Sequence, residues 1–146
     1  GGHCIAVDPY FIKAQFPLES KLIATAREIN NYKAFWCVEK IQNEILKFEL
    51  RHERKPVVAL CGLAFKPNID DLRESPASFI VEKIINSNDP SYFNIVEPNI
   101  SFHNKFEIVK LEQAVSNSDI IALLIRHDEF VKQDYKDLIV LNFCNA

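Results

Sequence analysis

The chain of 146 residues has few glycines, and these are Gly1, Gly2 and Gly62. A Gly-x-Gly-x-x-Gly fingerprint cannot be assembled from glycines at these positions, which excludes a dinucleotide-binding loop of the usual kind. The chain also lacks a run of about 20 apolar residues, which a membrane-spanning helix needs. No basic segment followed by an apolar stretch opens the sequence, as it would in a secretory signal. We therefore expect a cytoplasmic protein without a membrane partner.

Charge and histidine do not form the patterns that nucleic acids or metal ions require. The chain has 17 basic and 20 acidic residues and a formal net charge of -3. It contains no basic run and no interleaving of basic and aromatic residues, which single-stranded nucleic acids need. His103 and His127 have no partners at ligand spacing. We therefore expect neither a nucleic acid partner nor a metal site.

The cysteines are Cys4, Cys37, Cys61 and Cys144. Their wide separation fits neither paired zinc ligands nor a dense disulfide scaffold, so we expect free thiols. Cys37 lies in a helical pattern and Cys61 in an apolar strand pattern, where each is expected to act as a small buried hydrophobe. Cys4 alone lies among expected loop residues, beside two glycines that allow a close approach to a ligand.

The first third of the chain has a helical pattern. From Leu18 to about Arg51, apolar residues recur at spacings of three and four, which predicts an amphipathic helix with an interruption around Asn30-Asn31. Thirty helical residues at about 1.5 Å each would span roughly 45 Å, which exceeds the width of a small domain. Part of the apolar stripe should then face another domain or subunit. We therefore predict a homodimer formed through helix 20–50.

After Pro56, short β-branched runs alternate with helical stretches. The expected strands are 57–61, 93–96, 120–125 and 138–141, and the expected helices are 77–86 and 111–116. This order predicts an α/β fold in which a long helical segment precedes a Rossmann-like parallel sheet with helices on both faces. We divide the chain near Lys55-Pro56 into domains 1–54 and 55–146.

The loop after the first expected strand is the best candidate for a ligand site, because open parallel sheets bind ligands beyond the carboxyl ends of their strands. It holds Phe65, Lys66, Asp70, Asp71 and Arg73. Lys66 and Arg73 can neutralise a diphosphate, and Phe65 can stack on a base. Ser75-Pro76 has the pattern of an N-cap and first helical turn. The alternative is a surface loop held by salt bridges among these charges.

Two features near the start of the chain have competing interpretations. His3 precedes Cys4, which suggests a thiol and base pair, but neighbours in sequence often point apart, so this pairing stays open. Tyr10-Phe11 is interpreted as part of the core rather than as a surface that stacks on a ligand.

Three motifs together resemble the nucleotide-sugar 6-dehydrogenase family. They are Gly1 through Phe11, Ala26 through Asn30 and Gly62 through Pro76. Their order and spacing match the family, and the resemblance covers nearly the whole chain.

The substrate is predicted from positions that differ between branches of the family. Ala6, Ile69 and His127-Asp128-Glu129-Phe130 favour the branch that acts on acetamido sugars. The resemblance thus implies UDP-N-acetyl-D-mannosamine as substrate, with UDP-glucose and UDP-N-acetylglucosamine as alternatives.

The resemblance also implies a missing part. Family members have an N-terminal NAD-binding domain, a central domain with the catalytic cysteine and a C-terminal nucleotide-sugar domain, and this chain resembles the last two. We therefore expect a C-terminal fragment that is inactive without the NAD domain. The family reaction oxidises the sugar C6 alcohol to a carboxylate with two NAD and one water, in polysaccharide biosynthesis.

The resemblance assigns two catalytic residues. Cys4 matches the nucleophile that forms a thiohemiacetal and then a thioester, because an aldehyde donates a second hydride only after a nucleophile has added to it. Asp8 matches a carboxylate that orders the hydrolytic water. The alternative for Asp8 is capping of the turn before Pro9.

Binding residues are assigned in the same way. Those that match nucleotide-sugar contacts are Gly1, Phe65 and Lys66. Arg73 matches a residue that reaches NAD, and Arg27 and Asn30 are expected to support the site or an interface. The segment Leu141-Asn142-Phe143-Cys144 departs from the family pattern, so no substrate contact is assigned there.

Two other classes of function remain open. A free-standing thiol enzyme would turn over without a further domain and would lose its activity on Cys4→Ala. A non-catalytic module for nucleotide binding and dimerisation would be indifferent to that substitution.

Overall fold

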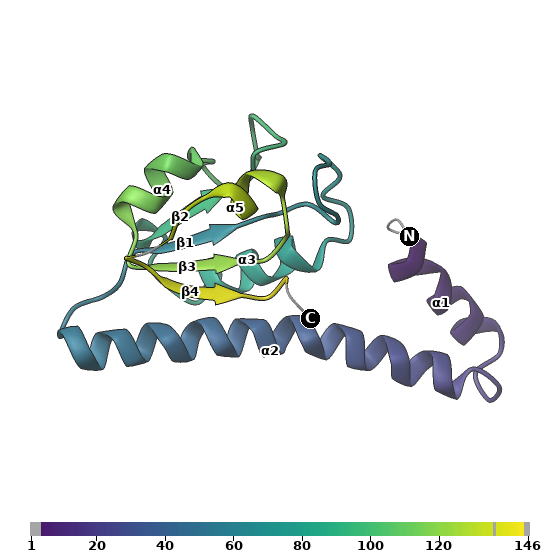
Figure 1. Ribbon diagram of the computed structural model, residues 1–146. Helices are drawn as coiled ribbons and strands as arrows, with labels where there is room; N and C mark the ends of the chain where they lie inside the picture. Colours follow the sequence, from purple (N-terminus) through teal and green to yellow (C-terminus); the bar gives the residue numbers. More distant parts are fainter. Residues whose placement is uncertain (1–3, 136, 145–146) are drawn as a thin grey trace.

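The computed structural model describes residues 4–135 and 137–144 and shows a parallel sheet beside one long helix (Figure 1). Helices α1 (Cys4–Gln15) and α2 (Lys21–His52) come first. The elements that follow are β1 (Val58–Cys61), α3 (Pro76–Asn86), η1 (Pro90–Tyr92), β2 (Phe93–Val96), α4 (Leu111–Asn117), β3 (Ile120–Leu123), α5 (Asp128–Lys132) and β4 (Ile139–Asn142). The expected α/β class is confirmed, with strand ends within two residues of expectation.

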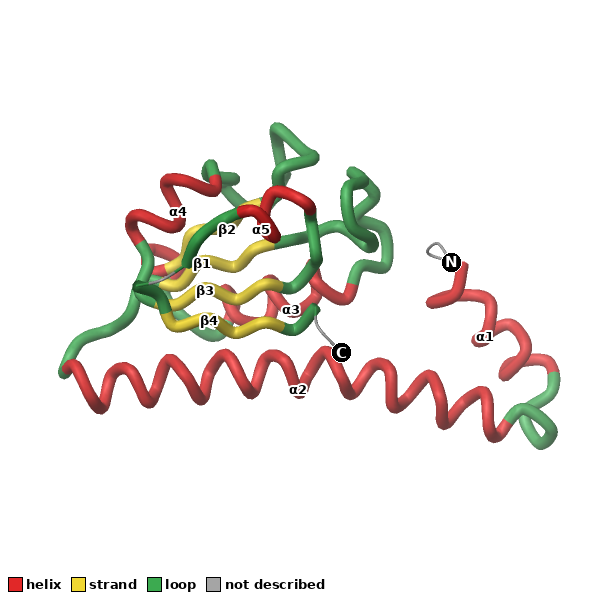
Figure 2. The backbone as a smooth tube through the Cα atoms, in the orientation of Figure 1, coloured by secondary structure: helices red, strands yellow, loops and turns green. Residues whose placement is uncertain are grey.

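The four strands are parallel in the order β2-β1-β3-β4, and Figure 2 shows them side by side. Side chains of β1 alternate between two apolar clusters. Val58 and Leu60 pack with residues of α2 and α3, whereas Ala59 and Cys61 pack with residues of α4 and α5. Because both faces of β1 and β3 are covered, these strands are continuous apolar runs rather than alternating ones.

Helix α2 runs without interruption, so the expected break at Asn30-Asn31 is wrong. The Asn31 side chain accepts a hydrogen bond from Arg27 Nη2 at 3.3 Å and donates one to the Tyr10 hydroxyl at 2.9 Å. These contacts keep the amide from competing with the helix backbone. The 32 residues of α2 span about 48 Å at 1.5 Å per residue.

The two halves of α2 have different surroundings. The second half, together with Ala34 just before it, buries a stripe of residues against the sheet and α3, namely Ala34, Cys37, Val38, Ile41, Ile45 and Phe48. The first half extends beyond the sheet and lies beside α1 (Figure 1). The second half therefore shares the core of the sheet, and the division of the chain at Lys55-Pro56 stays a prediction.

Helix α1 corrects two expectations. Cys4 is the first residue of this helix and does not lie in a loop. No glycine interrupts the stretch from Cys4 to Gln15, and its one proline, Pro9, is accommodated inside the helix. Tyr10 and Phe11 are 43% and 69% exposed, so their interpretation as core is wrong. Helix α1 has no fully buried residue, and its apolar side chains Ile5, Phe11 and Ile12 are 45–69% exposed.

Two features are absent from residues 4–135 and 137–144. No helix in these ranges combines the length and apolar character that crossing a membrane requires. The same ranges contain no cluster of three or more His, Cys, Asp or Glu side chains that could hold a metal ion.

Candidate functional site

The loop that follows β1 leaves the sheet at the point where the strand order reverses. Gly62 begins this loop with a φ of +103° and donates its N–H to the Val96 carbonyl at 2.8 Å. A Cβ at this position would lie 2.8 Å from Ile125 Cβ and 2.9 Å from Ile125 N. Glycine is therefore required here, both for the backbone conformation and for the close passage of the chain leaving β3.

The far end of the loop is fixed by the start of α3. The Ser75 hydroxyl accepts a hydrogen bond from the Ser78 N–H at 3.3 Å and donates to the Ala64 carbonyl at 2.9 Å. Pro76 occupies the first helical position. The predicted N-cap at Ser75-Pro76 is confirmed, and it also closes loop 62–75 on itself.

The charged residues of the loop divide into paired and unpaired groups. The Arg73 side chain forms two hydrogen bonds with the Asp71 carboxylate, from Nε at 2.9 Å and from Nη2 at 2.8 Å, and the Arg73 N–H forms a third at 3.0 Å. The half-buried Lys66 has no hydrogen bond or ion pair within the described part of the chain. The salt-bridge alternative therefore describes Arg73 and Asp71 but leaves the Lys66 ammonium available to a ligand.

A cleft of about 850 Å³ separates this loop from the helices at the start of the chain. One wall comes from α1 and the first half of α2 and includes Ala6, Tyr10 and Arg27. The other wall comes from the loop and the start of α3 and includes Phe65 and Ser75. The structure thus brings the expected binding loop and the Ala26–Asn30 motif to opposite sides of one cavity.

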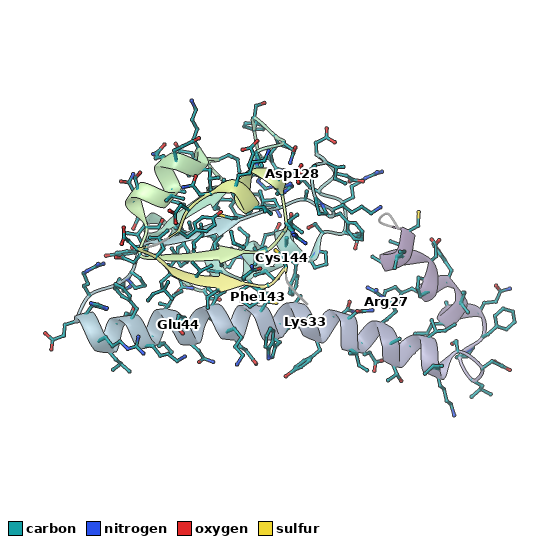
Figure 3. All side chains as sticks on the ribbon, in the orientation of Figure 1. Arg27, Lys33, Glu44, Asp128, Phe143 and Cys144 are labelled. Carbon is teal, nitrogen blue, oxygen red and sulfur yellow. The ribbon has the colours of Figure 1, made fainter. Side chains whose placement is uncertain are left out.

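Arg27 is a cationic side chain that lines this cleft and whose hydrogen bonding is incomplete. Figure 3 shows it on the part of α2 that extends beyond the sheet. Its Nη2 donates to Asn31, and its guanidinium carbon lies 6.0 Å from the centre of the Tyr10 ring. Its Nε is buried and has no hydrogen-bond partner. A buried guanidinium N–H without an acceptor can be satisfied by an anionic ligand.

The two expected catalytic residues lie next to the cleft but do not line it. Cys4 and Asp8 are exposed and four residues apart on α1, which places them on the same face of the helix. Asp8 is inside the helix, so it does not cap a turn before Pro9. Asp71 raises the pKa of Arg73, first through its hydrogen bond and then through its charge. Gly1 and His3 lie outside the described residues.

The other three thiols are shielded from solvent to different degrees. Cys37 and Cys61 are buried, and desolvation raises the pKa of both thiols. Burial raises the pKa of Cys144 to about 11. The interpretation of Cys37 and Cys61 as buried hydrophobes is confirmed, and Cys4 is the exposed thiol.

Sequence reasoning did not predict a buried polar pair at the ends of β2 and β3. Glu97 and His127 are each 1% exposed, and their Oε2 and Nε2 atoms lie 3.1 Å apart. Burial alone would raise the pKa of Glu97, but hydrogen bonds from His127 and from the N–H groups of Leu63 and Asn99 bring it to about 2. A carboxylate and an imidazole that each follow a buried strand are the signal that could have indicated this pair.

Comparison of sequences relates the chain to known enzymes. Residues 59–142 match the family described as UDP-glucose/GDP-mannose dehydrogenase family, UDP binding domain. A UDP-N-acetyl-D-mannosamine dehydrogenase of Campylobacter jejuni is 46% identical over 151 aligned residues, which cover 99% of this chain and 35% of that protein. The enzyme of that name from Escherichia coli strain K12 is 41% identical over 138 residues, which cover 89% of this chain and 33% of that protein.

Comparison of structures gives a consistent result. The solved structure of a UDP-D-ManNAc dehydrogenase from Pyrococcus horikoshii is similar, with a TM-score of 0.75 and 28% sequence identity. The match covers 99% of this chain and 35% of that chain, so it includes the long helix as well as the sheet. The chain spans about a third of the length of the curated relatives it matches.

Proposed function

Because the chain belongs to the UDP-glucose/GDP-mannose dehydrogenase family, we propose that it binds the substrate of an NAD-dependent UDP-N-acetyl-D-mannosamine 6-dehydrogenase. The observation that carries this proposal is the cleft of about 850 Å³, whose size is ordinary for a small-molecule site. Arg27 with its unpartnered Nε lies on one wall, and Phe65 lies on the other. The unpaired Lys66 is adjacent to Phe65 in the chain.

In the proposed complex, these side chains divide the recognition of the UDP-sugar between them. The diphosphate carries the negative charge, and Lys66 and Arg27 supply cations that can donate charge-assisted hydrogen bonds to it. Phe65 supplies an apolar surface for the base or the sugar ring. Gly1, outside the described residues, is proposed as a further contact.

The described residues do not fit a binding site for NAD. A Rossmann-type site needs a glycine-rich turn after its first strand, so that the backbone can approach the pyrophosphate. Here the space beside Gly62 is filled by Ile125, and Gly62 is the only glycine in residues 4–135 and 137–144. We assign NAD to a part of the enzyme outside these residues, with Arg73 reaching towards it, and propose that the chain alone is inactive.

The catalytic proposal concerns Cys4 and Asp8. In the overall reaction two NAD accept the hydrides, and one water supplies the second carboxylate oxygen. The Cys4 thiolate adds to the C6 aldehyde and forms a thiohemiacetal, which gives a thioester on oxidation. Asp8, one helical turn from Cys4, holds the attacking water and takes its proton. Hydrolysis then releases the carboxylate and restores the thiol.

Calorimetric titration of the chain tests the binding proposal. We expect UDP and UDP-N-acetylmannosamine to bind, and Lys66→Ala to weaken binding by about 1–3 kcal/mol because a charge-assisted hydrogen bond is lost. The control is Lys110→Ala, which removes an exposed lysine before α4 and should leave the affinity unchanged. Absence of uridine-nucleotide binding by the wild-type chain would refute the proposal. Tighter binding of UDP-glucose or UDP-N-acetylglucosamine would instead change the proposed sugar.

An activity assay of two variants tests the catalytic proposal. In an enzyme that includes the NAD domain, we expect Cys4→Ala to abolish formation of the uronate and Cys144→Ala to preserve it. Full activity of Cys4→Ala would favour the alternative of a non-catalytic binding and dimerisation module. Turnover by the 146-residue chain alone would favour a free-standing thiol enzyme.

We also propose a cytoplasmic homodimer formed through α2. The four free cysteines agree with a reducing compartment. On α2, large exposed side chains lie away from the sheet, namely Leu22, Ile29, Tyr32, Leu46 and Leu50. Their exposed fractions of 55–84% leave an apolar stripe that a second copy can cover.

Sedimentation measures the predicted dimer directly. We expect the wild-type chain to sediment as a dimer at micromolar concentration and Ile29→Lys to sediment as a folded monomer, because a buried lysine in the interface is costly. Val131→Lys on α5 changes an exposed apolar residue far from the stripe and should remain dimeric. A monomeric wild-type chain would refute the proposal.

A further inference from the structure

Both ends of the segment 65–67 are held by the buried pair of Glu97 and His127. On one side, the two N–H groups of residues 63–64 donate to Glu97 Oε2 at 2.8 and 3.0 Å. On the other side, the Asn68 N–H donates to His127 Nδ1 at 2.9 Å. Because Glu97 and His127 contact each other, both anchors belong to one hydrogen-bonded unit.

The hydrogen bonds determine which nitrogen of His127 carries the proton. A backbone N–H can only donate, so the Nδ1 that receives the Asn68 N–H must be unprotonated. The Asn99 amide nitrogen lies 3.0 Å from the same Nδ1 and can also donate to it. Nε2 then carries the proton and donates to Glu97. The two ring nitrogens therefore have separate tasks, since Nε2 binds the carboxylate and Nδ1 holds the loop.

The residue that His127 holds has an unusual backbone conformation. Asn68 has a φ of +59°, in the left-handed region that residues other than glycine seldom adopt. Its side-chain Oδ1 accepts a hydrogen bond from the Asp128 N–H at 3.0 Å. Asn adopts this region more readily than most other residues, and here residues 127 and 128 stabilise it by binding the backbone and side chain of Asn68 together.

We propose that His127 is a positioning residue for nucleotide binding: its Nδ1 sets the conformation of 65–67 and thereby the affinity of Lys66 for a uridine diphosphate group. This inference rests on the proposed function of Lys66. If the pair only stabilised the fold, replacing either nitrogen would lower the stability of the chain. The affinity for UDP would then not depend on which of the two nitrogens is replaced.

Two substitutions separate the tasks of the two nitrogens. In His127→Asn, the amide oxygen lies two bonds beyond Cβ, as Nδ1 does, so the acceptor for Asn68 is kept and the donor to Glu97 is lost. In His127→Gln, the amide nitrogen lies three bonds beyond Cβ, as Nε2 does, so the donor is kept and the acceptor is lost. We expect His127→Gln to weaken UDP binding about five- to tenfold, the effect of one lost hydrogen bond, and His127→Asn to stay within about twofold of wild type.

Two measurements without ligand complete the test. In the wild-type chain, ¹⁵N NMR should show a neutral His127 protonated at Nε2, and this holds even if a variant fails to fold. Amide hydrogen exchange at residues 65–68 should be faster in His127→Gln than in His127→Asn. Protonation at Nδ1, or equal exchange and equal affinity in the two variants, would overturn the inference. If the wild-type chain binds no UDP, the proposed function fails. Amide hydrogen exchange at residues 65–68 and the His127 tautomer then still decide whether His127 holds the loop.

Discussion

The four residues of β1 are each 0% exposed, whereas no residue of α1 is buried and Leu22 at the start of α2 is 82% exposed. The sheet region is shielded by its own helices, and the loop that leaves it is held by internal hydrogen bonds. The α1 region presents apolar side chains to solvent and meets the sheet region across the cleft. The comparison indicates that the wall formed by loop 62–75 is fixed by hydrogen bonds within the chain, whereas the wall formed by α1 contains no buried residue.

The largest difference between the regions should appear in stability. Leu60→Ala removes a side chain that is 0% exposed in the central strand β1, and we expect a loss of about 2–5 kcal/mol in the free energy of unfolding. The matched change Leu22→Ala removes an exposed side chain and should cost less than about 0.5 kcal/mol in the monomer. Urea unfolding followed by circular dichroism measures both. Equal losses would show that the two regions share one core.

The same contrast explains which parts of the fold were predictable. The strand at 120–123 is buried on both faces, so it appears in the sequence as a short apolar run, and its shortness and its two isoleucines favour a strand over a buried helix. The N-cap at Ser75-Pro76 was predictable because its residue types are specific to helix starts. In both cases, local sequence and tertiary burial favour the same structure.

The failures occurred where tertiary contacts decide. Asn30-Asn31 were expected to break α2, but a hydrogen bond from Asn31 to Tyr10, 21 residues away, lets the helix continue. Cys4 was expected in a loop because glycines precede it. The Glu97 and His127 pair was missed because the hydrogen bonds that join the two residues and hold residues 63–64 and 68 span 30 or more positions of the chain.

Acid should destabilise the sheet region through Glu97. The pKa of Glu97 is lowered from 4.5 to about 2 in the folded chain. Between these pH values the unfolded state therefore binds a proton that the folded state does not bind. The stabilisation is complete above about pH 4.5 and is lost as the pH falls towards 2, with a total of about 3 kcal/mol. Urea unfolding at pH 6, 4 and 2.5 measures this loss.

The Glu97→Gln variant shows whether the Glu97 carboxylate is responsible for the loss of stability in acid. Gln cannot ionise, so the variant should be less stable than wild type at pH 6 and should lose less stability between pH 4.5 and 2. The same decline in both proteins would assign acid sensitivity to other carboxylates. It would also contradict the view that the anchored loop is the acid-sensitive part of the sheet region.

The smallest expected effects concern two ion pairs, one at the sheet region and one between α1 and α2. Asp119 accepts two hydrogen bonds from Arg54 at 2.6 and 2.8 Å and one from the Val57 N–H at 2.9 Å, and so joins the end of α2 to the sheet. We expect Asp119→Ala to cost about 1–2 kcal/mol, because the half-buried Val57 N–H loses its acceptor. Lys13 and Glu28 lie 3.6 Å apart between α1 and α2, with side chains 45% and 70% exposed.

Glu28→Ala should therefore change stability by less than about 0.5 kcal/mol, and even less at high salt. Thermal unfolding of both variants at low salt and at about 0.5 M salt measures the difference, with salt screening the exposed pair more than the partly buried one. A loss for Glu28→Ala as large as that for Asp119→Ala would mean that α1 is docked as firmly as the sheet. The cleft beside Cys4 would then have two preformed walls, and the proposed nucleotide-sugar could bind there without movement of α1.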